Sequence, residues 1–403
     1  MPKKRLLPLL LSLFPIIIIL TQCLSKTEKT DPRGDDYDGA ATCVSCHKNI
    51  NSSYLHTAHF MASMPVTESN IQGSFLPGQN TFDYNGHTKV VMEKTDSGYF
   101  QTSYVNGTKL QSSRFDMTFG GIKGESYLTW DGNQLLELPV SYDNKLKNWI
   151  ISPGYDSTRI TLDRVINTAC MECHASYAKP QKLTVASFDE TAEGFDKNSV
   201  IMSIDCERCH GPAKAHVNFH TDNPEVKKAK YITSYSSLNR LQRIDLCGTC
   251  HSGRYPIITK STFEFKPGDT LSNFRRHSAY TPPKDYTHID VHGDQVDMLE
   301  SSKCFINSKM DCATCHDVHK NDRNTLAVYT QRCMSCHTTT NHNFCKMEGK
   351  LGMDVIKAQC ISCHMPALPS KAIVYQDKTA MVRTHHIAVY PDEVKKITAY
   401  LKN

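Results

Sequence analysis

The chain has 403 residues, of which 17 are Cys and 19 are His, and a formal net charge of +5 with only 22% charged side chains. Its length allows two or three domains, but a hydrophobic fraction of 39% leaves little aliphatic material for their cores. This composition excludes an ordinary cytosolic domain and predicts that something other than aliphatic side chains fills the interior.

The first 22 residues predict a signal peptide. Basic residues at positions 3–5 precede an apolar run over 6–20, which is shorter than the roughly 20 residues of a membrane-spanning helix. The run ends in Leu20-Thr21-Gln22-Cys23, which is similar to a bacterial lipoprotein cleavage site with Cys23 as the acylated residue, although Gln22 replaces the usual small residue. Simple cleavage and an uncleaved anchor are the alternatives. The polar residues that follow predict a flexible tether over 23–42.

From residue 43 onward one five-residue pattern, CxxCH, occurs seven times, and we number the copies motif 1 to motif 7 in chain order. The paired cysteines are Cys43 and Cys46, Cys170 and Cys173, Cys206 and Cys209, Cys247 and Cys250, Cys312 and Cys315, Cys333 and Cys336, and Cys360 and Cys363. The histidines that follow them are His47, His174, His210, His251, His316, His337 and His364. Motif 1 lies in a first haem segment over 43–65, and the other six lie within 166–366.

CxxCH is the attachment sequence of c-type haem, in which two thiols bond to the porphyrin and the next histidine ligates the iron. Zinc ribbons and disulfide frameworks also use paired cysteines, but neither explains a histidine after the second cysteine in all seven copies. The sequence therefore predicts seven covalently bound haem c groups. Their propionates would make the loaded protein acidic, so the positive formal charge is no argument for nucleic-acid binding.

Residues 66–165, between motifs 1 and 2, contain no CxxCH pattern. Alternating or β-branched runs separated by Gly, Asn and Asp predict strands over 88–93, 99–105, 114–119, 126–130, 135–142 and 149–152. We therefore expect an inserted antiparallel β module without haem of its own. A docking or carbohydrate-binding role for this module stays open.

The six-motif domain over 166–366 is expected to consist of short helices and loops. Helices are predicted over 224–230, 238–250 and 391–401, the last within a C-terminal segment over 367–403. The motif spacings have no fixed period, which excludes a solenoid. The predicted fold class is α+β: mainly short helices and loops wrapped around a multihaem core, with an antiparallel β module inserted between motifs 1 and 2.

Seven irons require up to seven sixth ligands, and twelve histidines lie outside the motifs. Five of them have positions that favour distal ligation: His59, His216, His319, His342 and His385. His319 is only three residues from His316, so it cannot reach the opposite face of the same haem and would have to ligate a neighbouring one. The others could be ligands or hydrogen-bonded surface residues: His56, His87, His220, His277, His288, His292 and His386.

Three further residues are of interest. Cys304 and Cys345 remain after the motifs are assigned, and they could form a disulfide or lie as free thiols beside a haem. Met365 directly follows a proximal histidine and is expected to pack rather than ligate. No evident sixth ligand lies close to His251 in the sequence, which makes motif 4 the candidate for a five-coordinate haem.

The sequence resembles the cytochrome c-554 family of multihaem c-type cytochromes over most of the chain after residue 40. The matching segments are Cys46-His47 with 54–59, then 117–120, 127–128, 138–140, Cys173-His174, 206–212 with His216, 315–319 and 363–366. The resemblance implies electron transfer through closely stacked haems, mostly with two histidine ligands, and His59, His216, His319 and His385 as distal ligands. The seven motifs and the β module depart from the four-haem members.

Two functions are expected. The first is an exported, membrane-tethered heptahaem cytochrome that passes electrons between redox partners, such as a quinol-oxidising complex and other cytochromes. The alternative is a reductase of a small nitrogen or sulfur species at one five-coordinate haem, although no catalytic residues stand out. We expect a periplasmic or cell-envelope location, with a lipid anchor at Cys23 in a membrane of a Gram-negative bacterium, and no nucleic-acid partner.

Overall fold

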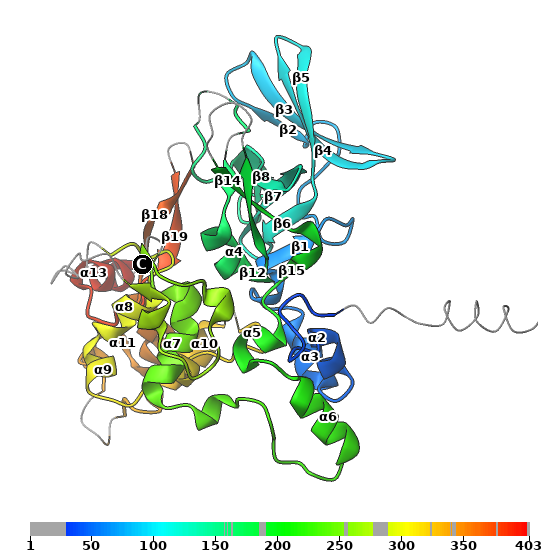
Figure 1. Ribbon diagram of the computed structural model, residues 1–403. Coiled ribbons are helices and arrows are strands. Elements are labelled where there is room, and N and C mark those ends of the chain that lie inside the picture. Colours follow the sequence, from blue (N-terminus) through cyan, green and yellow to red (C-terminus); the bar gives the residue numbers. More distant parts are fainter. Residues whose placement is uncertain are drawn as a thin grey trace, which may run out of the picture.

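The computed structural model describes residues 30–156, 158, 160–162, 164–184, 191–253, 257–276, 289–322, 325–338, 340, 344–375 and 378–400. The expected signal peptide, the acylation site Cys23, and His277, His288 and His342 lie outside these residues. Figure 1 shows a β-rich part next to a helical part. No helix in the described ranges is both long and apolar enough to cross a membrane.

Two antiparallel sheets make up most of the β-rich part. The larger sheet contains seven strands in the order β1-β6-β7-β8-β11, with β9 paired to β7 and β10 paired to β9. Its strands are β1 (Ser63–Pro65), β6 (Met117–Gly120), β7 (Gly124–Asp131), β8 (Gln134–Glu137), β9 (Val140–Asp143), β10 (Asn148–Ile151) and β11 (Val165–Ile166). The smaller sheet has the order β2-β3-β4-β5 and projects away from the helices in Figure 1. Its strands are β2 (Thr81–Asp83), β3 (Thr88–Thr95), β4 (Gly98–Val105) and β5 (Thr108–Arg114).

Four of the six predicted strands agree with β3, β4, β7 and β10 to within two residues at each end. The other two predictions are wrong because each spans a break between strands. The predicted strand 114–119 is divided between β5 and β6 at Asp116, whose carboxylate accepts a hydrogen bond from the backbone N–H of Trp130. The predicted strand 135–142 is divided between β8 and β9 at Pro139, which has no N–H to donate to a neighbouring strand.

The helical part consists of short helices. They are α2 (Ala40–Val44), α3 (Lys48–Tyr54), α4 (Thr168–His174), α5 (Cys206–His210), α6 (Lys214–Asp222), α7 (Arg240–His251), α8 (Gln295–Glu300), α9 (Lys303–Ile306), α10 (Leu326–Met334), α11 (Glu348–Leu351), α12 (Met353–His364) and α13 (Pro391–Tyr400). Single 3-10 turns are η1 (Phe60–Ala62), η2 (Lys197–Ser199), η3 (Tyr235–Ser237), η4 (Thr262–Glu264), η5 (Leu271–Asn273) and η7 (Cys312–Thr314).

Short two-stranded sheets connect the helices. Each is antiparallel, and the pairs are β12 (Ala175–Tyr177) with β15 (Ile201–Met202), β13 (Pro180–Thr184) with β14 (Thr191–Phe195), β16 (Ile257–Ile258) with β17 (Arg275–Arg276), and β18 (Ala367–Tyr375) with β19 (Lys378–Arg383). The helix and strand content confirms an α+β fold.

Two of the three predicted helices are confirmed. Helix α7 (Arg240–His251) agrees with the predicted range 238–250 to within two residues at each end, and begins after Asn239, whose side chain and that of Gln242 cap each other's backbone N–H groups. Helix α13 (Pro391–Tyr400) agrees with the predicted range 391–401 over all of its described residues. The prediction over 224–230 is wrong, since the helix in this region is α6, which ends at Asp222. Pro224 therefore follows the end of a helix instead of starting one.

The two larger clusters of buried apolar side chains lie around the sheets, and a smaller one of Phe265, Leu271 and Phe274 lies in the helical part. One cluster, inside the β-rich part, is Phe82, Val90, Met92, Phe115, Tyr127, Leu138, Val140, Trp149 and Ile151. Gly73 packs against Trp149 so closely that a Cβ would meet ring carbons at 2.3 Å. By contrast, α2, α3, α6, α9, α11 and α13 contain no buried residue among those described. These six helices therefore need something other than apolar side chains to pack against, as the composition predicts.

Candidate functional site

All seven CxxCH motifs line one connected cavity of about 4640 Å³. Pockets for one small ligand typically measure about 300–1,000 Å³, so this cavity has room for several cofactors. Four histidines predicted as distal ligands line it too: His59, His216, His319 and His385. The paired thiols and imidazoles that covalently attached haem requires are thus gathered around one space, and these residues fit that group.

Polar side chains just before three of the motifs fix the turns that carry them. Asn167 caps α4 by accepting the N–H of Cys170 at 3.2 Å, and Asp205 caps α5 by accepting the N–H of Arg208 at 2.9 Å. Asp311 accepts the N–H of Thr314 at 3.2 Å in η7. One helical turn places residues i and i+3 on the same side, so both thiols of a motif face the cavity together.

Four motif histidines each face a second imidazole across the cavity. The ring centres of His47 and His216 are 6.5 Å apart, and their planes are 17° from parallel. The other pairs are His210 with His319 at 6.1 Å and 12°, His316 with His385 at 6.2 Å and 25°, and His251 with His59 at 6.2 Å and 74°.

This spacing is the one that two ligands of a single iron require. A metal–imidazole bond is about 2 Å and the nitrogen lies about 1 Å from its ring centre, so imidazoles on opposite sides of one metal have centres roughly 6 Å apart. In the part of the chain that the structure describes, no group of three or more His, Cys, Asp or Glu side chains converges on a common metal position. The facing pairs therefore suit the two axial positions of a haem iron.

Protein acceptors hold the Nδ1 atom of five imidazoles that line the cavity, three of them in facing pairs. Nδ1 of His174 donates to the carbonyl of Ala62 at 3.2 Å, and Nδ1 of His210 donates to that of Thr233 at 3.1 Å. The others are His251 with Gln295 Oε1 at 3.2 Å, His364 with the Ala388 carbonyl at 2.9 Å, and His216 with the Lys230 carbonyl at 2.8 Å. Each bond fixes the tautomer that leaves Nε2 available for a metal.

The pairs extend across motifs, and one expectation must be corrected. His319 faces motif 3, His216 faces motif 1 and His385 faces motif 5, so none of them serves the motif that it follows most closely in the chain. The expectation that motif 4 is the candidate for a five-coordinate haem is not supported, because His59 lies opposite His251. Sequence distance concealed this pair, since almost 200 residues separate the two histidines.

The remaining histidines have other surroundings. The His174 ring stacks on Phe119 of β6, with centres 4.3 Å apart and planes 15° from parallel. His220 lies beside His216 at 4.6 Å between ring centres, and Nδ1 of His386 is 3.3 Å from the hydroxyl of Tyr390. His56 and His87 are exposed, and His292 lines the cavity.

The variable residues of motifs 2 and 3 join these motifs into one polar cluster. Glu172 of motif 2 is completely buried and accepts hydrogen bonds from the hydroxyl of Ser261 and the N–H of Thr262. Arg208 of motif 3 donates to the carbonyls of Glu172 and Thr262. Arg275 lies 3.7 Å from the Glu172 carboxylate. These roles could not be predicted from the sequence, because the positions between the cysteines carry no pattern of their own.

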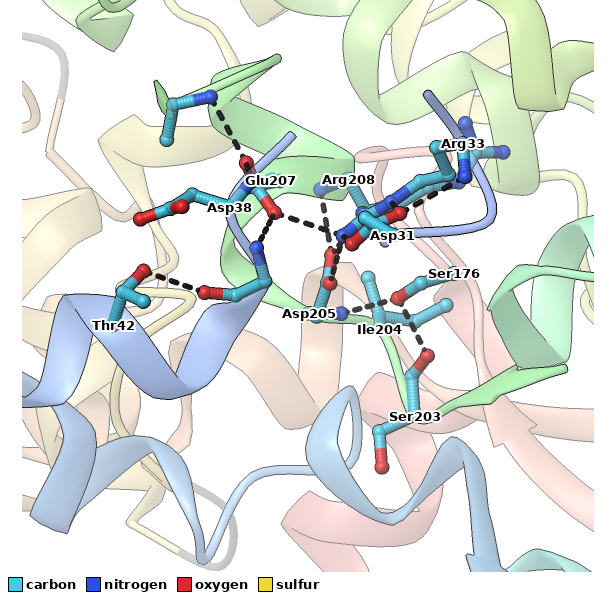
Figure 2. Close-up of polar contacts among 12 residues, drawn as sticks. Asp31, Arg33, Asp38, Thr42, Ser176, Ser203, Ile204, Asp205, Glu207 and Arg208 are labelled. Atoms are coloured by element: carbon cyan, nitrogen blue, oxygen red, sulfur yellow. Dashed lines mark hydrogen bonds and ion pairs between the residues drawn. The ribbon is translucent and has the colours of Figure 1, made fainter. Parts of the chain in front are cut away.

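The segment before motif 1 binds to motif 3 through Arg33 (Figure 2). This guanidinium contacts Asp31 and Asp205 at 2.9 Å and Glu207 at 2.8 Å, and its side chain is only 5% exposed. Glu207 also accepts the N–H groups of Asp38, Gly39 and Ala213. The described residues of the expected flexible tether are therefore folded, because this cluster fixes residues 31–39 to α5.

Burial and charge act in opposite directions on the carboxylates of this cluster. Burial raises the pKa of Glu207, although the N–H donors and Arg33 counteract it. Burial would also raise the pKa of Asp31, but the hydrogen bonds and charge of Arg33 outweigh it and lower this pKa. The pKa of Arg33 is raised despite its burial, because three carboxylates surround it.

Cys304 and Cys345 are free thiols in this structure and line the same cavity as the motifs. Cys304 Sγ lies 3.3 Å from Met310 Sδ. Of the two arrangements left open by the sequence, this position agrees with free thiols beside the haem motifs.

Comparisons with known proteins agree with the geometry. The sequence profile of the family described as cytochrome c554 and c-prime matches residues 153–211, which contain motifs 2 and 3. The crystal structure of the outer cell wall cytochrome OcwA has a similar fold, with a TM-score of 0.54 and 16% sequence identity over 90% of this chain and 82% of that chain. No curated protein matches the chain. The seven motifs, the facing imidazoles and these similarities together identify the chain as a multihaem c-type cytochrome that resembles the cytochrome c554 family.

Proposed function

We propose that the chain is a heptahaem electron-transfer protein of the cell envelope, with one haem c on each CxxCH motif. The observation that carries the proposal is the set of four facing imidazole pairs, each spaced for two ligands of one iron. Two histidine ligands leave no position for a substrate at the iron, so such sites favour electron transfer over chemistry at the metal.

Bound haem supplies reversible one-electron chemistry between Fe(III) and Fe(II). The chain's own residues hold the sites in place: the motif thiols provide the covalent attachment, and the imidazoles provide axial ligation. Acceptors for Nδ1, such as the Thr233 carbonyl for His210, keep the ligand rings in one orientation and raise their basicity. Electron transfer then needs little rearrangement of the protein.

The partners we propose are other redox proteins of the envelope. A reduced quinol-oxidising complex or cytochrome would donate electrons, and an oxidised cytochrome or terminal acceptor would receive them. The sequence Leu20-Thr21-Gln22-Cys23 supports a lipid anchor at Cys23 after cleavage of the signal peptide. The similarity in fold to an outer cell wall cytochrome supports a location in the cell envelope. Within it, the location we propose is the periplasm, at a membrane of a Gram-negative bacterium.

One observation favours reduction of a small nitrogen or sulfur species as a second candidate function. Among the described residues, the His174 ring stacks on Phe119 and no imidazole faces it across the cavity. An open iron at motif 2 would make this reaction possible.

Mass spectrometry and EPR of the exported holoprotein test the two candidates. The mass should exceed that of the processed chain by seven haems, and the reduced protein should have a c-type absorption spectrum. The ferric protein should give mainly low-spin EPR signals. A colourless protein would contradict both functions. A high-spin signal that shifts with nitrite, hydroxylamine or sulfite would favour the reductase.

A further inference from the structure

Motif 4 touches two other motifs through its two cysteines. Cys173 Sγ lies 4.0 Å from the carbonyl of Cys250, and Cys250 Sγ donates to the carbonyl of Glu172 at 3.5 Å, so the two thiols are neighbours. Cys247, the first cysteine of motif 4, is likewise a neighbour of Cys312. Helix α7 packs against both α4 and η7. Motif 4 therefore adjoins motif 2 on one side and motif 5 on the other.

Motif 3 is the third neighbour of motif 4. Cys209 is close enough to Cys247 and Cys250 to interact with them electrostatically. The other cysteine of motif 3, Cys206, lies in thiol contact with Cys43 of motif 1, and α2 packs against α5. Motif 1 therefore reaches motif 4 through motif 3.

Motifs 5, 6 and 7 are also neighbours of one another. Cys333 of motif 6 is close to Cys315 of motif 5 and Cys360 of motif 7. Helix α10, which carries the start of motif 6, packs against α12, which carries motif 7. Motif 6 thus lies between the other two.

We propose that the seven sites form a branched electron path with its junction at motif 4. One arm passes through motif 3 to motif 1, the second ends at motif 2 against the seven-stranded sheet, and the third passes through motifs 5 and 6 to motif 7. Because each thiol pair attaches to one edge of its porphyrin, motifs whose thiols touch hold neighbouring edges close together. The inference rests on the proposed electron-transfer function and adds the order of the sites.

Burial of the motif residues separates internal sites from sites near the surface. Both residues between the cysteines are buried in motifs 2, 3 and 4, whereas Ser45 of motif 1 and Ser335 of motif 6 are exposed. The junction is therefore internal, and the first and third arms reach the surface where partner proteins can dock. In each step one site is oxidised and its neighbour is reduced by one electron. The reduced partner protein proposed above supplies the first electron, and the oxidised partner accepts the last.

Ligand exchange can distinguish the junction from the end of an arm. In His59→Met the altered ligand faces motif 4, and in His216→Met it faces motif 1. Methionine retains an axial ligand and raises the reduction potential, so each variant keeps one site reduced where the wild-type site is oxidised. A reduced site carries one positive charge less, which lowers the midpoint potentials of adjacent haems.

A redox titration followed by EPR gives the number of haems that respond. Besides one raised midpoint in each variant, we expect downward shifts of three haems in His59→Met, at motifs 2, 3 and 5, and of one in His216→Met, at motif 3. Equal numbers in the two variants, or a larger number in His216→Met, would overturn the branched order. If His59→Met does not accumulate, Gln295→Leu serves the same purpose, because it removes the Nδ1 acceptor of His251 and raises the same midpoint.

Failure of the order and failure of the proposed function give different results. Seven haems by mass with a raised midpoint in each variant, but with the wrong numbers of shifted neighbours, would contradict only the branching. Loss of haem from the wild-type protein would contradict the proposed function. An unchanged set of midpoints in both variants would show that His59 and His216 are not ligands, and would overturn the pairings on which the test depends.

Discussion

His319 and His210 face each other with ring centres 6.1 Å apart and planes within 12° of parallel. His319 follows motif 5 directly, whereas His210 belongs to motif 3. The same exchange occurs for His216, which lies beyond motif 3 and faces His47 of motif 1. Each of these sites therefore combines the histidine of one motif with a histidine that follows a different motif. The segments that carry the motifs cannot fold as independent units.

Replacing His319 with Ala should convert one low-spin haem into a high-spin haem, because the iron at motif 3 would lose its sixth ligand. All seven haems should remain attached, since the thiols are unchanged. EPR of the ferric protein and mass spectrometry check the two statements. His87→Ala is the matched control, as His87 is exposed in the β-rich part. An unchanged low-spin spectrum in His319→Ala would contradict the assigned pair.

Replacing Arg33 with Met should strongly reduce the free energy of unfolding. The variant leaves the buried carboxylates of Asp205 and Glu207 without their cation, and breaking a buried ion pair in this way costs about 3–5 kcal/mol. Denaturant titration of the holoprotein measures the loss. Lys94→Met is the control, because Lys94 and Glu68 form an exposed pair whose removal should have no measurable effect. Equal effects in the two variants would show that the Arg33 cluster does not stabilise the fold.

The Glu125 carboxyl should make stability depend on pH. Burial raises its pKa from 4.5 to about 7, so the folded state favours the protonated form. Its contribution to stability is complete below pH 4.5 and is lost as the pH rises through about 7, amounting to roughly 3 kcal/mol for a shift of this size.

Glu125→Gln removes that titration while retaining an acceptor for the N–H of Gln72 and the hydroxyl of Tyr127. We expect a flatter dependence of the unfolding free energy between pH 4.5 and 8, and a variant more stable than the wild type at pH 8. Glu68→Gln, at an exposed position, should leave the wild-type profile in place. The assignment to Glu125 fails if its Gln variant retains the full slope.

Replacing Cys23 with Ser should release the protein from membranes, because the hydroxyl cannot carry the thioether-linked lipid. Fractionation of cells that express the wild type and the variant measures the distribution. Cys304→Ser is the control, since this thiol belongs to the cavity and not to the anchor. Retention of Cys23→Ser in the membrane fraction would contradict lipid anchoring.

The motifs and most long strands could be predicted because their information is local. CxxCH needs only five consecutive residues, and the alternation in β3 or β4 lies within eight. The need for His319 to face another motif could also be predicted, from the short loop after His316. The particular partner could not, because the sequence contains no signal that joins His319 to His210.

Other features depend on tertiary contacts. Residues 31–39 look like a polar tether, but Asp205 and Glu207, far along the chain, bind Arg33 and order them. His251 seems to lack a ligand until the fold brings His59 next to it. Pro224 is compatible with a helix start or a helix end, and the preceding helix α6 decides between the two.

The pair His316 and His385 has a consequence for the biogenesis of the protein. An exported chain emerges from its N-terminus onward, so motif 5 leaves the translocation channel well before the segment that carries His385. Haem can therefore be attached at motif 5 before His385, the second axial ligand, has been exported. The site then has only its motif histidine until synthesis of the chain is nearly complete. A nonsense mutation between codons 364 and 385 would therefore leave a lasting defect at motif 5, even though every attachment sequence had already been made.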